Sequence, residues 1–210
     1  MKTKFAATNH SQISLTSLTL KGISWSGISQ FTSLGLRFII SAILARLLLP
    51  RDFGLLGMVV VFSGVIGMFS ELGFGAAVIQ RKDIAEEHLS SVFWLNVVTG
   101  LILTLLMLGL APGIAYFYGE KKLTSITMVL GTQFFISSFG IVQRTLFTKN
   151  LEFKKLAVIE IISMGVAGGI AILLAFRDMG VWSLVTQSIL FSAITVVLLW
   201  SWSEWRPHLL

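Results

Sequence analysis

The chain has 210 residues, of which 55% are hydrophobic and 12% charged, with 16 Lys and Arg against 10 Asp and Glu. Its mean hydropathy of +0.86 lies outside the usual range of soluble domains, so the composition indicates a membrane protein with no separate soluble domain. The chain has no cysteine, which excludes a disulfide, a thiol nucleophile and an iron–sulfur centre.

Apolar segments long enough to cross a membrane follow one another along most of the chain. A helix needs about 20 residues to cross a hydrocarbon core of about 30 Å. The segments that meet this requirement are Gly22–Leu49, Phe53–Gln80, Ser91–Tyr118, Leu123–Phe147, Leu156–Phe176 and Gly180–Trp200. Each is too long and too uniformly apolar to be a strand of a barrel. We therefore predict an all-α, polytopic membrane protein with six transmembrane helices.

Lys and Arg are unevenly distributed between the two sets of loops that these spans define. The side of the termini carries Lys2, Lys4, Lys21, Arg81, Lys82, Arg144, Lys149, Lys154, Lys155 and Arg206. The opposite side carries only Arg46, Arg51, Lys121, Lys122 and Arg177. Because cytoplasmic loops carry the excess of basic residues, both termini are predicted to be cytoplasmic. The domains expected are a cytoplasmic segment at residues 1–21, a six-helix bundle at residues 22–202 and a cytoplasmic tail at residues 203–210.

The pI near 9.9 has a simple explanation in this topology. A basic cytoplasmic face lies against anionic lipid, and this accounts for the excess of positive charge without a nucleic-acid partner.

Polar residues at helical spacing follow one face of the first span. This stripe contains Ser26, Gln30, Ser33, Arg37 and Ser41, and a shorter one in the fourth span contains Gln133, Ser137, Gly140 and Arg144. For a single Ser or Gln, a hydrogen bond between helices is the simpler explanation. Arg37 differs, because a guanidinium has five donors to satisfy and cannot lose its charge. Together the stripes predict a hydrophilic cavity inside the bundle.

Glu71 lies inside the second span, about 9 residues or ~14 Å of helix from the expected cytoplasmic turn. An ionisable group at that depth is costly unless it faces protein, water or a partner. We therefore expect Glu71 to face the cavity, where it could pair with Arg37. Isolated polar positions on the other spans also indicate this cavity; they are Asn96, Glu160 and Gln187.

Motifs of catalysis and cofactor binding are scarce. His10, His88 and His208 lie in the termini or a loop without a second ligand at helical spacing, so no metal site is predicted. The chain has no phosphate-binding loop of the type G-x-x-x-x-G-K-[ST], which argues against a built-in ATPase. We predict no cofactor. Two glycine pairs, Gly109-x-x-x-Gly113 and Gly165-x-x-x-Gly169, are typical of close helix packing.

Several segments, distributed along the chain, carry a family resemblance. They are RFIISAILARLLLPRDFGLLG (Arg37–Gly57), ELGFGAAVIQRKD (Glu71–Asp83), FWLN (Phe93–Asn96), AYFYGE (Ala115–Glu120), QRTLFTKNLEFKKLA (Gln143–Ala157) and GVWSLV (Gly180–Val185). They resemble the polysaccharide-transporter branch of the multidrug, oligosaccharidyl-lipid and polysaccharide exporter superfamily, the Wzx-type flippases of bacterial envelopes.

The resemblance implies a transporter rather than an enzyme. Such proteins move an undecaprenyl-diphosphate-linked oligosaccharide across the bacterial inner membrane for O-antigen, capsule or exopolysaccharide biosynthesis, by alternating access between two six-helix lobes. They have roughly twice as many spans as this chain. The chain is therefore expected to be the N-terminal lobe, with a truncation at its C-terminal end. Its expected partners are the lipid-linked oligosaccharide, membrane lipid and a second six-helix lobe in cis or in trans.

Arg is suited to a diphosphate because it keeps its charge and can bind two oxygens at once. We therefore expect Arg37, within the cavity, and Arg144, at its cytoplasmic mouth, to bind the headgroup. The other residues expected to line the cavity are Glu71, Ser26, Gln30, Ser33, Ser41 and Gln133. A membrane-embedded glycosyltransferase or ligase is a weaker alternative, since the acids are scattered over caps and turns. A non-transporting subunit or scaffold of a polysaccharide export complex also remains an alternative.

Overall fold

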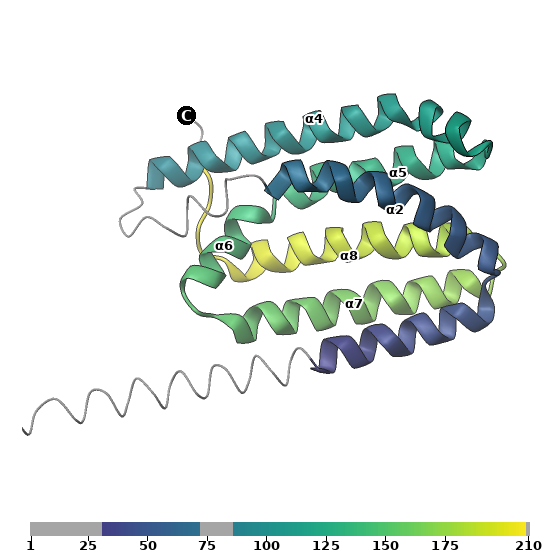
Figure 1. The fold of residues 1–210 in the computed structure, drawn as a ribbon. Helices are drawn as coiled ribbons and strands as arrows, with labels where there is room; N and C mark the ends of the chain where they lie inside the picture. The colour runs from purple at the N-terminus through teal and green to yellow at the C-terminus, as the bar shows by residue number, and fades with distance from the viewer. Residues whose placement is uncertain (1–30, 72–85, 209–210) are drawn as a thin grey trace, which may run out of the picture.

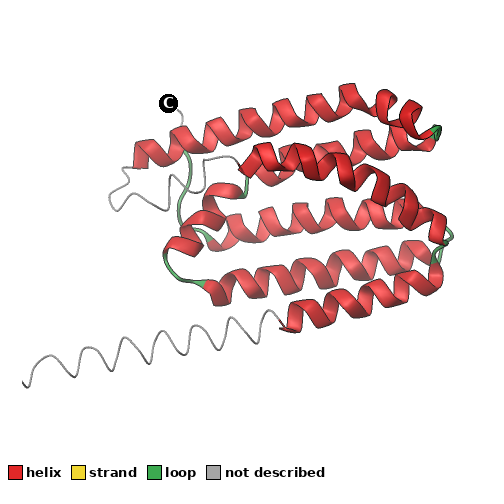
Figure 2. Cartoon of the chain, in the orientation of Figure 1, coloured by secondary structure: helices red, strands yellow, loops and turns green. Residues whose placement is uncertain are grey.

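The computed structural model describes residues 31–71 and 86–208, and this part of the chain is helical without a strand (Figure 2). The helices are residues 31–47, α2 (Pro50–Glu71), α4 (Glu86–Tyr118), α5 (Lys122–Ser138), α6 (Ile141–Lys149), α7 (Phe153–Ala175) and α8 (Val181–Trp202). They lie alongside one another, with their connections at the two ends of the bundle (Figure 1). The prediction of an all-α fold is confirmed.

Within the described residues, four helices are long and apolar enough to cross a membrane. These spans are Pro50–Met68, Leu89–Tyr118, Phe153–Ala175 and Val181–Trp202. They correspond to the second, third, fifth and sixth spans expected from the sequence. Residues 31–47, the described part of the first expected span, are helical but shorter than the about 20 residues that a crossing requires. The chain is thus a polytopic membrane protein.

The prediction of one continuous helix over Leu123–Phe147 is wrong. This segment forms α5 and α6, which are bent by 46° at a short break and form a fifth span if they are taken together. At the break, the Trp200 indole donates to the Phe139 carbonyl oxygen at 2.8 Å. A Cβ on Gly140 would lie 3.2 Å from both Leu199 Cδ1 and Val196 Cγ2. Contacts with α8 therefore hold the break, and hydropathy along α5 and α6 does not reveal such contacts.

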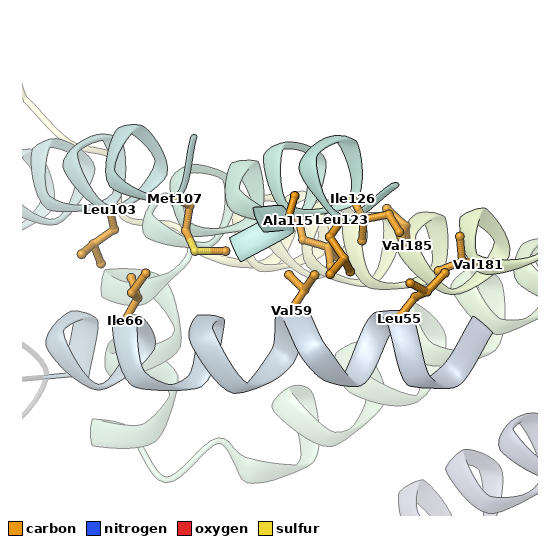
Figure 3. Packing of buried hydrophobic residues seen from close by; sticks show 11 residues of the cluster. Leu55, Val59, Ile66, Leu103, Met107, Ala115, Leu123, Ile126, Val181 and Val185 are labelled. Carbon is orange, nitrogen blue, oxygen red and sulfur yellow. The ribbon is translucent and has the colours of Figure 1, made fainter. Parts of the chain in front are cut away.

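The main hydrophobic core lies between α2, α4, α5 and α8. Figure 3 shows Leu55, Val59 and Ile66 of α2 pointing toward side chains of the other three helices, among them Met107 and Val185. A second core packs residues 31–47 against α7 and α8. Large apolar side chains also remain exposed on the outside of the bundle, including Val61, Leu105, Leu173 and Val197. In a membrane, lipid tails would cover these outer faces.

Among the helices α2 to α8, α4 and α5 make the most extensive contact, and glycines permit their close approach. A Cβ on Gly100 would lie 2.8 Å from the Phe134 carbonyl oxygen and 2.7 Å from Ser138 Cβ. Thr104 joins the same two helices, because its hydroxyl donates to the Gly131 carbonyl oxygen at 2.9 Å.

The two Gly-x-x-x-Gly pairs do not have this packing role within the described residues. A Cβ added at Gly109, Gly113, Gly165 or Gly169 would have no neighbour within 4 Å. Their predicted part in close packing is therefore not seen inside the described bundle.

Gly100 and Gly109 provide a matched test of the α4–α5 contact. We expect Gly100→Ala to destabilise the bundle by about 1–3 kcal/mol, because the new methyl group would press on the α5 backbone. Gly109→Ala has open space and should be neutral or stabilising, by up to about 1 kcal/mol. Thermal unfolding in detergent, followed by circular dichroism, measures the difference. Equal midpoints for the two variants would show that α4 and α5 are not in this close contact.

The first residues of α2 and of α8 lie at the same end of the bundle (Figure 1), and a carboxylate joins them there. Asp52, at the start of α2, accepts hydrogen bonds from Val181 N–H at 3.0 Å and from Leu49 N–H at 3.2 Å. Gly180, which precedes α8, has a positive φ of 55° and lies directly against this carboxylate. Asp52 thus caps the N-terminus of α8, a role that the N-cap residue Gly180 cannot fill because it has no side chain. Arg51 forms an ion pair with Glu120 in the α4–α5 connection.

Candidate functional site

The first of two polar cavities lies between residues 31–47, α5, α7 and α8. It has a volume of about 200 Å³ and is lined by Arg37, Ile40, Ser41, Gln133, Met164, Ala167, Gln187, Ser188 and Phe191. Ile40, Met164 and Phe191 provide apolar wall. The polar groups come from three of the four helical segments, so tertiary packing assembles this cavity.

The second cavity adjoins the first, because Arg37 and Phe191 line both. It has a volume of about 170 Å³, and its other lining residues are Arg144, Leu156, Ile159, Glu160, Thr195 and Leu199. Two guanidinium groups and one carboxylate therefore face this space, which gives it a formal positive charge. Thr195 Oγ1 is buried without a hydrogen-bond partner among the described residues.

The cavities follow one another along the bundle. Gln187 of the first cavity and Thr195 of the second lie on α8 two turns apart, or about 12 Å at 1.5 Å per residue. Thr195 is the nearer of the two to the C-terminal end of α8. The second cavity thus lies toward the end of the bundle that carries the α6–α7 connection and the C-terminus (Figure 1).

Arg37 forms an ion pair with Glu160 of α7, with 3.5 Å between Nη2 and Oε1. The two side chains are 60% and 36% exposed. Where the cavity holds water, a pair this exposed contributes only about 0–1 kcal/mol, because water screens it. A phosphate could therefore replace Glu160 as the partner of Arg37 at low cost. Arg144 has no ion pair with another residue of the described segments.

The structure brings together four of the residues singled out from the sequence. Arg37, Ser41 and Gln133 line the first cavity, and Arg144 joins Arg37 in the second. Arg144 lies on α6, directly after the break between α5 and α6. The preceding residue, Gln143, is buried and supports this break, because its amide nitrogen donates to the Phe139 carbonyl oxygen at 2.7 Å.

The remaining predicted residues are not part of the two cavities as described. Ser33 is buried, with 8% of its surface exposed, and lines neither cavity. Ser26 and Gln30 lie outside the described residues. Glu71 is the last residue of α2 and its side chain also lies outside the described part, so its pairing with Arg37 stays a prediction.

Two further lining residues, Glu160 and Gln187, were noted in the sequence as isolated polar positions of the predicted cavity, and the structure places both there. Sequence reasoning did not single out three others, which are Ser188, Phe191 and Thr195. A signal for two of them was present, because Phe191 and Thr195 follow Gln187 at steps of four residues and therefore share one face of α8.

Comparisons with known proteins identify relatives along most of the chain. It is 30% identical over 196 residues to the teichuronic acid biosynthesis protein TuaB of Bacillus subtilis, which covers 92% of this chain and 41% of the relative. It is 27% identical over 188 residues to the succinoglycan biosynthesis transport protein ExoT of Rhizobium meliloti, covering 90% and 38%. The lipopolysaccharide biosynthesis protein WzxC of Escherichia coli is 30% identical over 148 residues, covering 70% and 30%.

The chain thus spans less than half the length of these relatives. No solved structure gives a significant match. The family model described as polysaccharide biosynthesis protein matches residues 43–210. Because this match covers more than half of the chain, the chain belongs to the polysaccharide biosynthesis protein family.

Proposed function

We propose that this chain is one lobe of a flippase that moves an undecaprenyl-diphosphate-linked oligosaccharide from the cytoplasmic to the outer leaflet of the bacterial inner membrane. The family and the relatives named for polysaccharide biosynthesis and transport support this proposal. The observation that carries it is the second cavity, where Arg37 and Arg144 face the same space and Glu160 is the one acidic residue among the described lining residues. We propose a transport role without catalysis.

The physical requirements of the reaction agree with such a cavity. Each sugar hydroxyl that enters hydrocarbon without a hydrogen bond costs several kcal/mol, and a phosphate charge costs far more. The lipid tail can remain in the bilayer, so only the headgroup needs a polar path. Two guanidinium groups can hold the diphosphate through charge-assisted, bidentate hydrogen bonds. The polar surface between the two cavities provides part of this path.

A second six-helix lobe, in the same chain or supplied separately, completes the transporter in this proposal. Matches that cover 41%, 38% and 30% of the relatives support it, because the relatives contain much more chain. The exposed side chain of Arg37 also supports it, since a guanidinium 60% exposed at membrane depth needs cover from lipid.

The proposal can be tested in vesicles of Escherichia coli polar lipid that contain a fluorescent undecaprenyl-diphosphate oligosaccharide. Accessibility of the sugar to an external lectin measures its transfer between leaflets. We expect transfer when this chain is reconstituted together with a second lobe, and little or none with either part alone. Protein-free vesicles are the control. Absence of transfer by the combined lobes would favour the alternative role as a non-transporting subunit or scaffold.

The proposed orientation places both termini in the cytoplasm. The start of α2, which contains Arg51, lies at one end of the bundle with the α4–α5 and α7–α8 connections, which contain Lys121 and Arg177 (Figure 1). The α6–α7 connection lies at the other end with the C-terminal end of α8, which supports the division into two sets of loops. Reporter fusions after Lys4, Lys82, Lys155 and Arg206 should therefore read as cytoplasmic. Fusions at Asp52, Lys121 and Arg177 should read as external. An external signal at Lys155 would contradict this topology.

A further inference from the structure

We propose that the first cavity binds the sugar attached directly to the diphosphate, so that the two cavities divide the headgroup into a sugar subsite and a phosphate subsite. This inference rests on the proposed function and adds to it a second site with its own ligand chemistry. The residues that carry it are Gln133 of α5 and Gln187 and Ser188 of α8.

Two amides without partners face the first cavity. The side-chain amides of Gln133 and Gln187 make no hydrogen bond with another described residue, although both line the same space. Each amide offers two donors and an acceptor, the set that matches the hydroxyl groups of a sugar. Polar groups at this depth are costly when they lack a partner. A ligand rich in hydroxyl groups would satisfy both amides at once.

Two hydroxyl groups and an aromatic ring complete the lining. Ser41 and Ser188 come from two different helices, and Ser188 donates to the Leu184 carbonyl oxygen at 3.2 Å, which leaves its lone pairs free to accept. Phe191 lies where the two cavities meet. The C–H face of a pyranose ring packs well on such an aromatic face, while its hydroxyl groups point to the polar walls.

The charges distinguish the two subsites. Among the residues that the structure describes, two guanidinium groups line the second cavity, whereas Arg37 and no carboxylate line the first. A cation is therefore disfavoured in the first cavity, and a wholly apolar ligand would leave the amides unsatisfied. A neutral, hydroxyl-rich group fits this lining.

The position of Arg37 links the subsites in the order that the ligand requires. In a lipid-linked oligosaccharide, the first sugar is bonded directly to the diphosphate. Arg37 lines both cavities, so a diphosphate held by Arg37 and Arg144 would place that sugar beside Gln187. The volume of about 200 Å³ suits one pyranose ring rather than a whole oligosaccharide.

The test compares the binding of two lipids to this chain in phosphatidylcholine nanodiscs by native mass spectrometry. One lipid is undecaprenyl diphosphate, and the other carries one sugar, taken in turn from glucose, galactose and N-acetylglucosamine. We expect at least one glycosylated lipid to bind about tenfold more tightly than undecaprenyl diphosphate, as about 1.4 kcal/mol of added hydrogen bonding would give.

Gln187→Leu and Gln133→Leu should each remove most of this sugar-dependent gain, because they keep the size of the side chain and delete its amide. Their affinity for undecaprenyl diphosphate should stay at the wild-type level, which also reports on folding. Ser188→Ala and Ser201→Ala form a matched pair, since both hydroxyls donate to the carbonyl oxygen four residues earlier on α8. Only Ser188 lines the first cavity, so only Ser188→Ala should lower the gain.

Three results would overturn the sugar subsite. Equal binding of the plain and all glycosylated lipids would exclude it and leave the proposed function intact. If Gln187→Leu and Gln133→Leu lower the affinity for the plain and the glycosylated lipid by the same factor, the two amides stabilise the fold and do not bind the sugar. If the wild-type chain binds none of these lipids, the proposed substrate class fails, and the subsite fails with it.

Discussion

Arg37→Ala is expected to abolish most transport by the two-lobe protein while the protein still inserts and accumulates. The variant loses a guanidinium that faces both cavities. A charged hydrogen-bonding partner of this kind contributes about 2–3 kcal/mol, which corresponds to a loss of about 30- to 150-fold. Its ion pair with Glu160 is partly exposed, so folding should depend little on it. The lectin assay in vesicles measures the initial rate of transfer.

Arg46→Ala is the matched control, because Arg46 lies on the same helical segment, is exposed and lines neither cavity. It should transport at close to the wild-type rate. Arg37→Lys should recover only part of the activity, since an ammonium cannot form the bidentate contact. Normal transport by Arg37→Ala, or a failure of that variant to accumulate, would show that Arg37 serves the packing of the bundle instead.

The partner of Arg37 can be identified with double substitutions. The sequence led us to expect Glu71, whereas the described contact is with Glu160. If Glu160 mainly neutralises Arg37, Arg37→Gln combined with Glu160→Gln should be more stable than Arg37→Gln alone, because the single change leaves Glu160 without its counter-ion. The same comparison with Glu71→Gln tests the original expectation.

Asp52→Ala is expected to lower the thermal stability of the bundle without altering either cavity directly. The change removes two acceptors that hold Val181 N–H and Leu49 N–H, and it leaves the start of α8 without a cap. Loss of a cap and of a hydrogen bond to a charged group corresponds to about 1–3 kcal/mol. The midpoint of thermal unfolding in detergent, followed by circular dichroism, measures this effect.

Three further variants are compared with Asp52→Ala in the same unfolding experiment. Asp52→Asn should be intermediate, because an amide oxygen still accepts but carries no charge. Gly180→Ala should also destabilise, since its Cβ would lie 3.1 Å from Asp52 Oδ1 at a positive φ of 55°. Glu204→Ala removes an exposed acid near the opposite end and should leave the midpoint unchanged. An unfolding midpoint for Asp52→Ala equal to that of Glu204→Ala would exclude the capping role.

The sequence by itself determined the membrane character of the chain and the extents of most helices. Both follow from local properties, because a run of apolar residues of sufficient length becomes a helix in hydrocarbon whatever surrounds it. The helices α4, α7 and α8 accordingly begin and end within a few residues of the expected spans. Arg37 and Arg144 could be singled out in the same way, because a permanent charge in an apolar segment is visible without a structure.

The tertiary structure alone decided which residues meet. Glu160 reaches Arg37 across 123 positions of sequence, and Asp52 caps α8 across 129. The break between α5 and α6 depends on α8, through Trp200 and the close approach of Leu199 to Gly140. The cavities likewise exist only where faces of different helices come together. Such contacts depend on how the helices pack, and the hydropathy and spacing of one helix contain no information about the side chains of the next.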